Sequence, residues 1–246
     1  MVCFRSAASC EPTKAKPYLE PPEVAIWRLH DMIERICIAT NSQDIECYIG
    51  GSDNFRYKIY PEYKANRTKE KPHYLEACRE MLVTQYKATV VNGYETDDAL
   101  GIAQTKYDGN SRICSLDKDL LQIPGSHYNW VSGVSRLVSP LDGLRAFYKQ
   151  LILGDKTDNI PGYDGKLRSE CPKFIQKLQE PIDEMTDEYD MYQHVLDVYF
   201  HSWDEDQEIS CTDTVKRNAQ LLYILKEEDK FWQPPIGPTE ELKDLS

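Results

Sequence analysis

The sequence predicts an α/β fold with a mostly parallel central sheet and a helical C-terminal portion. Up to about residue 153, short apolar segments typical of strands alternate with longer segments whose apolar residues recur at helical spacing. Beyond that point only helical patterns remain. Because alternating strands and helices form parallel units, we expect an α/β core over 1–153, a helical part over 154–230 and a Pro-rich tail over 231–246.

Each predicted element has a local signal in the chain. Pro21 and Pro22 suit the first turn of a helix, and an apolar stripe at helical spacing follows as far as Ile36. The basic stretch 56–73 contains two prolines and predicts a loop with a helical piece. The remaining predictions are strands at 45–49, 88–91 and 112–116, and helices at 73–86, from about 97, at 140–153, 172–179, 188–200 and 213–227.

Composition excludes several classes of protein. The 246 residues include 29 Lys plus Arg and 41 Asp plus Glu, which gives a net charge of −12. The apolar runs are too short to span a membrane, and the N-terminus lacks the basic and apolar regions of a secretory leader. The eight cysteines form no CxxC pair, which argues against a zinc ribbon and favours a reducing cytoplasm.

The charge is sorted along the chain. Residues 180–208 contain eleven Asp or Glu and no Lys or Arg, whereas 56–73 contain six basic residues and two acidic ones. An acidic total is therefore compatible with a basic surface that binds phosphate, and we expect 180–208 to face away from it.

Three acidic clusters follow predicted elements. Residues 95–98 (ETDD) and 117–119 (DKD) each follow a strand, and 155–158 (DKTD) follow the helix at 140–153. Taken singly, capping or turn chemistry explains each of them. Ligands of α/β sheets bind beyond the carboxyl ends of the strands, and so many carboxylates together require cations. Hard divalent ions such as Mg²⁺ or Mn²⁺ suit oxygen ligands, and ion pairs of this kind serve phosphoryl transfer.

The basic stretch supplies what a phosphodiester substrate needs. Lys64 and Arg67 are three residues apart, so they would share one face of a helix and could neutralise a scissile phosphate. Tyr57, Tyr60 and Tyr63 alternate with these charges in a pattern that suits stacking on bases.

Four motifs occur in one order along the chain: YKANR (63–67), ETDDALG (95–101), SLDKDLLQIPG (115–125) and LILGDKTDNIPG (151–162). Together they resemble the 5′-nuclease superfamily, which includes tailed-phage 5′→3′ exonucleases, the N-terminal domain of bacterial DNA polymerase I and flap endonucleases. The resemblance covers about residues 1–230, and the phage exonucleases are the most similar branch.

The resemblance implies a 5′-nuclease-like fold whose helical portion contains a helix–three-turn–helix element, and it implies a site with two divalent ions. The implied catalytic cations are Lys64 and Arg67. The implied metal ligands are Glu95, Asp97, Asp98, Asp117, Asp119, Asp155 and Asp158. The candidate DNA contacts, with those of the basic stretch included, are Arg5, Arg56, Tyr63, Lys166, Arg168 and Lys173.

The implied activity is metal-dependent 5′→3′ hydrolysis of DNA that has a free 5′ end, a nick or a flap, with RNA–DNA hybrids as further candidate substrates. We expect a monomer in the cytoplasm, that of the host cell if a phage encodes the chain.

Three departures from the family pattern qualify these expectations. Residues 162–168 (GYDGKLR) replace the usual Gly-Ile-Gly turn, which argues against a K⁺ site. Gly51 stands where the family has an Asp, with Asp53 as the candidate replacement. Met1 follows directly on the position of the family's first strand and Asp-Gly motif, so we expect the natural start upstream.

Three other hypotheses compete with this one. Haloacid-dehalogenase phosphatases share the DxD and GDxxxD patterns, but fewer than forty residues separate the two here, too few for that fold. PIN-type ribonucleases lack the long basic stretch. A protein that binds branched or nicked DNA without cutting it stays open, because the first Asp motif is missing.

Overall fold

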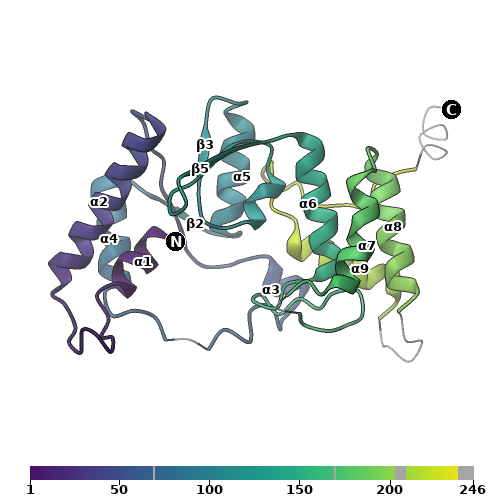
Figure 1. Ribbon diagram of the computed structural model, residues 1–246, viewed down its shortest axis with the longest axis horizontal. Helices are drawn as coiled ribbons and strands as arrows, with labels where there is room; N and C mark the ends of the chain where they lie inside the picture. Colours follow the sequence, from purple (N-terminus) through teal and green to yellow (C-terminus); the bar gives the residue numbers. More distant parts are fainter. Residues whose placement is uncertain (69, 169, 203–208, 238–246) are drawn as a thin grey trace.

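The structure is a computed structural model that describes residues 1–68, 70–168, 170–202 and 209–237 (Figure 1). In chain order its elements are α1 (Val2–Ala8), α2 (Pro22–Thr40), β1 (Tyr48–Gly50), α3 (Arg56–Ile59), α4 (Leu75–Tyr86), β2 (Thr89–Val91), α5 (Thr96–Lys106), β3 (Arg112–Cys114), the 3₁₀ helix η1 (Asp119–Gln122), β4 (Gly125–Asn129), β5 (Val134–Val138), α6 (Pro140–Leu153), α7 (Lys173–Gln179), the 3₁₀ helix η2 (Glu180–Asp183), α8 (Glu188–Phe200) and α9 (Cys211–Leu222). None of the helices described has the length and apolar character needed to cross a membrane.

The strands confirm the α/β class but correct the prediction of one central sheet. β1 pairs with β2 in parallel, and β3 pairs with β4 in parallel, so the described strands form two small sheets. β4 and β5 form an antiparallel hairpin that the sequence analysis missed. Its signal is Gly133 in the turn, with φ of +70°, a conformation that favours glycine.

Helix α5 connects the two sheets, since it contacts both β1 and β3. It begins directly after β2, with only residues 92–95 between them. The N-terminus of α5 is therefore fixed close to the carboxyl end of the strand that precedes it, where the first acidic cluster lies.

Helices α1, α2 and α4 pack together on one side of the molecule (Figure 1). Their common core contains Ala7, Leu29, Ile33, Cys78 and Leu82. Helix α1 was not predicted, whereas α2 and α4 confirm the predicted helices. Because α4 lies in this group and α3 contacts α9, the basic stretch between α3 and α4 connects two parts of the molecule.

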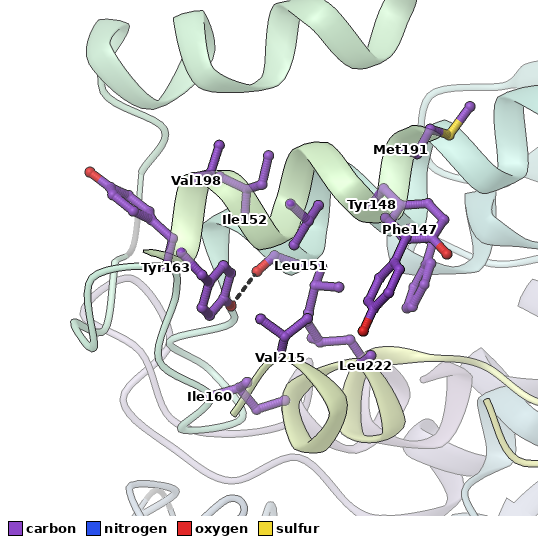
Figure 2. Packing of buried hydrophobic residues seen from close by; sticks show 14 of the residues in the cluster. Phe147, Tyr148, Leu151, Ile152, Ile160, Tyr163, Met191, Val198, Val215 and Leu222 are labelled. Carbon is purple, nitrogen blue, oxygen red and sulfur yellow. Dashed lines mark hydrogen bonds between the residues drawn. The ribbon is translucent and has the colours of Figure 1, made fainter. Parts of the chain in front are cut away.

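The second core joins α6 to the C-terminal helices (Figure 2). Phe147 and Leu151 of α6 pack among side chains of α8 and α9, and the Tyr199 hydroxyl donates a hydrogen bond to the Leu151 carbonyl over 2.8 Å. Trp232 of the predicted tail is only 5% exposed and its ring lies 5.8 Å from that of Tyr192. Trp232 thus attaches the tail to this core.

Helix α6 has the boundaries that its sequence predicts. The Ser139 side chain accepts a hydrogen bond from the Asp142 amide and Pro140 occupies the first turn, so both start signals are present. The helix ends at Gly154, whose φ is +74°. A side chain there would come within 2.5 Å of the Ile160 carbonyl, so the following loop folds back closely on the helix end.

Candidate active site: a carboxylate cluster with two cations

The three acidic clusters lie together in the structure. Burial raises the pKa of Asp97 to about 7, and the negative charges of Asp117 and Glu95 contribute to the shift. Burial likewise raises the pKa of Asp119 to about 6, with contributions from Asp117 and Asp155. The three segments, which follow β2, β3 and α6, therefore form one electrostatically coupled cluster.

The third segment belongs to the same cluster. Burial and the neighbouring charge of Asp158 raise the pKa of Asp155. Its Oδ1 accepts hydrogen bonds from the Thr157 amide over 2.7 Å and the Asp158 amide over 3.3 Å, which fixes the loop after α6. The turn chemistry expected of these residues is present, and it holds the Asp155 carboxylate against its own loop.

The donor chemistry fits a hard divalent cation. Half-buried carboxylates with raised pKa values resist ionising together, and a divalent ion relieves that repulsion. Among the described residues, no three carboxylate, imidazole or thiol groups already stand in a metal-ligating arrangement. Binding an ion there therefore requires some of these side chains to reorient.

Two cations of the basic stretch lie against the cluster. The Lys64 ammonium forms an ion pair with Glu95, and its Nζ lies 3.4 Å from Asp158 Oδ2. The Arg67 guanidinium pairs with Asp158 Oδ1 and is half exposed. The structure thus brings together the proposed catalytic cations and two of the proposed metal ligands.

The two cations do not share a helix face, which corrects the prediction. Residues 61–66 form consecutive turns, and Lys64 has a φ of +60°. Hydrogen bonds to the loop after α6 hold this conformation: the Lys64 amide donates to the Asp158 carbonyl over 2.9 Å, and Asn159 Nδ2 donates to the Glu62 carbonyl over 2.8 Å. Asn66 Nδ2 donates to the Lys156 carbonyl over 2.5 Å.

Tyr63 lies inside the site, where it cannot stack on a base. Its side chain is 2% exposed, and its hydroxyl lies 3.1 Å from Glu95 Oε2 and 2.9 Å from Asp158 Oδ2. This burial corrects the assignment of Tyr63 to the DNA contacts. The hydroxyl instead connects two carboxylates that come from different elements, a role that the sequence analysis missed.

Arg56 and Asp98 form a buried pair beneath the site. They are 2% and 0% exposed, and the guanidinium donates two hydrogen bonds, of 2.6 and 2.9 Å, to the carboxylate. Arg56 also donates to the Leu221 and Tyr223 carbonyls, and Asp98 accepts from the Glu95 and Leu225 amides. With these partners neither side chain is free for phosphate or metal, so we remove Arg56 from the DNA contacts and Asp98 from the metal ligands. The capping explanation holds for Asp98.

Asn54 also holds a carboxylate of the cluster, and the sequence analysis missed it. Asn54 Nδ2 donates to Glu95 Oε1 over 2.8 Å. No sequence signal marks Asn54.

The other proposed DNA contacts lie on the surface. Arg5 is exposed on α1, with its guanidinium 5.5 Å from the Trp130 ring centre. Lys166 and Arg168 pair with Asp164, and Lys173 is exposed at the start of α7. Within the described residues, no hydrogen bond or ion pair joins these four side chains to the carboxylate cluster.

Gly51 is closely packed against the end of β2 and the residue that follows it. A Cβ at Gly51 would lie 2.2 Å from Asn92 Oδ1 and 2.8 Å from the Val91 carbonyl oxygen, so an aspartate there would require both the Asn92 side chain and the backbone to move. Asp53 is exposed, with a φ of +62°.

Sequence comparisons identify related proteins. The model of the family described as "5′-3′ exonuclease, N-terminal resolvase-like domain" matches residues 3–150. DNA polymerase I of Pseudomonas aeruginosa is 31% identical over 128 residues, which cover 45% of this chain and 14% of that protein. DNA polymerase I of Bacillus caldotenax is 29% identical over 149 residues, which cover 52% of this chain and 17% of that protein. The chain thus spans less than a fifth of the length of these relatives.

Three solved structures from bacteriophage T5 share the fold, each at 16% identity. A T5 protein co-crystallised with metal ions has a TM-score of 0.59, with 80% of this chain and 82% of that chain covered. A T5 flap endonuclease variant in a pseudo-enzyme-product complex with DNA and metal ions has a TM-score of 0.57, with 89% and 85% covered. A T5 5′-exonuclease mutant has a TM-score of 0.52, with 80% and 78% covered.

Proposed function

The chain belongs to the 5′-3′ exonuclease family, and from that premise we propose that it is a divalent-metal-dependent nuclease that hydrolyses DNA from a free 5′ end. The observation that carries the proposal is the coupled cluster of carboxylates from three elements, with Lys64 and Arg67 lying against it. The T5 flap endonuclease of similar fold was solved with DNA and metal ions, which supports the same chemistry here.

Each part of the site has a proposed role. The candidate ligands of two ions, Mg²⁺ or Mn²⁺, are Glu95, Asp97, Asp117, Asp119, Asp155 and Asp158. Bound ions of this class lower the pKa of water and neutralise phosphate charge. Lys64 and Arg67 bind the oxygens of the scissile phosphate, and the planar guanidinium can donate two hydrogen bonds at once. Tyr63 orients Glu95 and Asp158.

The proposed substrate is duplex DNA with a 5′ end, a nick or a flap, and RNA–DNA hybrids are further candidates. Lys166 and Arg168, in the segment that joins α6 to α7, and Lys173, the first residue of α7, would contact the duplex backbone where the helix–three-turn–helix element is proposed. Arg5 would contact phosphate from α1. Contacts of this kind carry affinity rather than sequence specificity.

The proposal is tested with flapped, nicked and blunt duplexes that carry a label at the 5′ or the 3′ end. We expect Mg²⁺ or Mn²⁺ to support release of short products from the 5′ end, and EDTA to abolish it. Binding of these substrates without any products would favour the DNA-binding hypothesis, and degradation from the 3′ end would contradict the proposed direction.

The metal site is tested with Asp155→Asn, which keeps the oxygen that accepts the two loop amides. Loss of a metal ligand removes several kcal/mol of transition-state stabilisation, so we expect activity to fall by at least about 100-fold while DNA affinity changes little. Asp108→Asn, at an exposed position with a φ of +43°, is the matched control. Equal activity of the two variants would contradict the assignment.

A further inference from the structure

The Lys64 ammonium lies between two of the proposed metal ligands. Its Nζ pairs with Glu95, is 3.4 Å from Asp158 Oδ2 and lies 4.8 Å from the centre of the Tyr63 ring. The Lys64 side chain is only 14% exposed. Arg67 pairs with the other oxygen of Asp158. Both carboxylates therefore already have positive partners that belong to the protein itself.

The backbone holds Lys64 in this position. Its amide donates to the Asp158 carbonyl over 2.9 Å, so the residue that carries the ammonium is attached to the residue whose carboxylate it faces. Hydrogen bonds from the Asn159 and Asn66 side chains join the same two segments, the turns at 61–66 and the loop after α6. A long lysine side chain loses rotamer freedom when it is confined in this way, and the attraction of the two carboxylates opposes that loss.

A divalent ion bound to Glu95 and Asp158 would lie close to the Lys64 ammonium, which already contacts these two carboxylates. Positive charges a few ångströms apart repel each other, so the ammonium and the ion cannot both bind these carboxylates fully. The lysine stem is flexible and can move its head group without movement of the backbone. The arrangement of the cluster agrees with this, since no three described ligand groups yet converge on one point.

We propose that Lys64 is an internal counterion that competes with the divalent cation for Glu95 and Asp158, and that occupation of the metal site releases its ammonium toward the substrate phosphate. This inference rests on the proposed nuclease function. It implies that metal and DNA bind with positive coupling, because the cation that binds phosphate becomes free only when the carboxylates have another partner.

The first test measures binding of Mn²⁺ or Mg²⁺ alone to the full chain by calorimetry, without DNA. Lys64→Met keeps the length of the side chain and removes its charge, so we expect about five- to tenfold tighter binding, as for the release of one partly exposed ion pair. Lys64→Arg keeps the charge and should bind like the wild type. Lys106→Met, about 14 Å along α5 from Asp97, makes the same charge change away from the site.

The second test follows Lys64 directly, by mass spectrometry of lysine acetylation with a limiting acylating reagent. We expect Mg²⁺ to raise the labelling of Lys64 in the wild type several-fold and to leave that of Lys106 unchanged. This measurement needs no substitution, so it does not depend on how a variant folds.

The possible outcomes distinguish failure of the Lys64 inference from failure of the proposed metal-dependent function. If the wild type binds the ions, equal or weaker binding by Lys64→Met, or labelling that Mg²⁺ does not raise, would overturn the inference alone. If no protein binds the ions, the proposed metal site fails and the inference fails with it.

Discussion

At the scale of single residues, the Tyr63 hydroxyl joins the two ends of the site, as the Lys64 ammonium also does. The hydroxyl reaches Glu95 at the start of α5 and Asp158 in the loop after α6, while its ring is buried. Groups that orient metal ligands in this way commonly change metal affinity or activity by about 10- to 100-fold when they are lost.

We therefore expect Tyr63→Phe to reduce metal-dependent activity at least about tenfold and to destabilise the protein by only about 1 kcal/mol, since the ring remains packed. Activity as a function of Mg²⁺ concentration, together with urea unfolding, measures the two effects. Tyr60→Phe, which removes a hydroxyl 3.3 Å from Glu62, is the control. If both variants lose activity equally, the bridging role is wrong.

Sequence reasoning predicted the positions of the carboxylates better than the roles of their neighbours. Glu95 and Asp117 follow strands, and position after a strand is enough to place a residue at a sheet edge. Arg56 and Tyr63 were assigned to DNA because they lie in a basic stretch. Their burial depends on α9 and on the loop after α6, more than ninety residues away, and no local pattern carries that information.

At the scale of elements, the buried Arg56–Asp98 pair fixes α3, α5 and the segment after α9 to one another. The guanidinium reaches carbonyls of residues 221 and 223, and the carboxylate accepts the Leu225 amide. The N-terminus of α5, which carries Glu95 and Asp97, is therefore positioned by the C-terminal part of the chain.

Arg56→Met should destabilise the protein by about 3–5 kcal/mol, because it leaves the Asp98 carboxylate buried without its partner. Urea unfolding followed by circular dichroism measures this, with Arg112→Met, at an exposed position, as the control. Adding Asp98→Asn to Arg56→Met should restore part of the stability, since the buried charge is then removed. A double variant less stable than Arg56→Met would contradict this explanation.

Helices were predicted better than strands for a physical reason. Helix α6 has its cap, its proline and its apolar stripe within fifteen consecutive residues, so local sequence determines both ends. β1, β2 and β3 overlap the strands predicted at 45–49, 88–91 and 112–116, but with three residues each they are too short for a pattern that fixes their ends. Four of the five residues of β5 are exposed, so it lacks the buried face that would mark it as a strand.

At the scale of the whole molecule, the acidic total is compatible with DNA binding because the charges are separated. Helix α8 buries Met191, Val195 and Tyr199 against α6 and α9, and Asp190 and Asp197 lie on its exposed side. Residues 203–208 of the acidic stretch lie outside the described residues. The carboxylate cluster is a second concentration of negative charge, and its effect on global stability depends on pH.

That dependence has a definite sign. The pKa of Asp97 is about 7 and that of Asp119 about 6 in the folded protein, both raised first by burial and then by neighbouring carboxylates. In the unfolded chain an aspartate titrates near about 4. Between these values the folded state binds more protons, so the metal-free protein loses stability as pH rises from about 4 to about 7.

Divalent ions should offset this loss by supplying the positive charge that the ionised cluster lacks. We therefore expect excess Mg²⁺ to raise Tm clearly at pH 7.5 and very little at pH 5, where Asp97 and Asp119 hold their protons. Scanning calorimetry at both pH values, with EDTA as the metal-free reference, measures this increase in Tm.

Asp155→Asn should reduce the Mg²⁺-dependent increase in Tm at pH 7.5, whereas Asp108→Asn should leave it unchanged. An increase in Tm that is equal at the two pH values would show that Mg²⁺ acts elsewhere on the acidic surface, because carboxylates with ordinary pKa values are largely ionised at both.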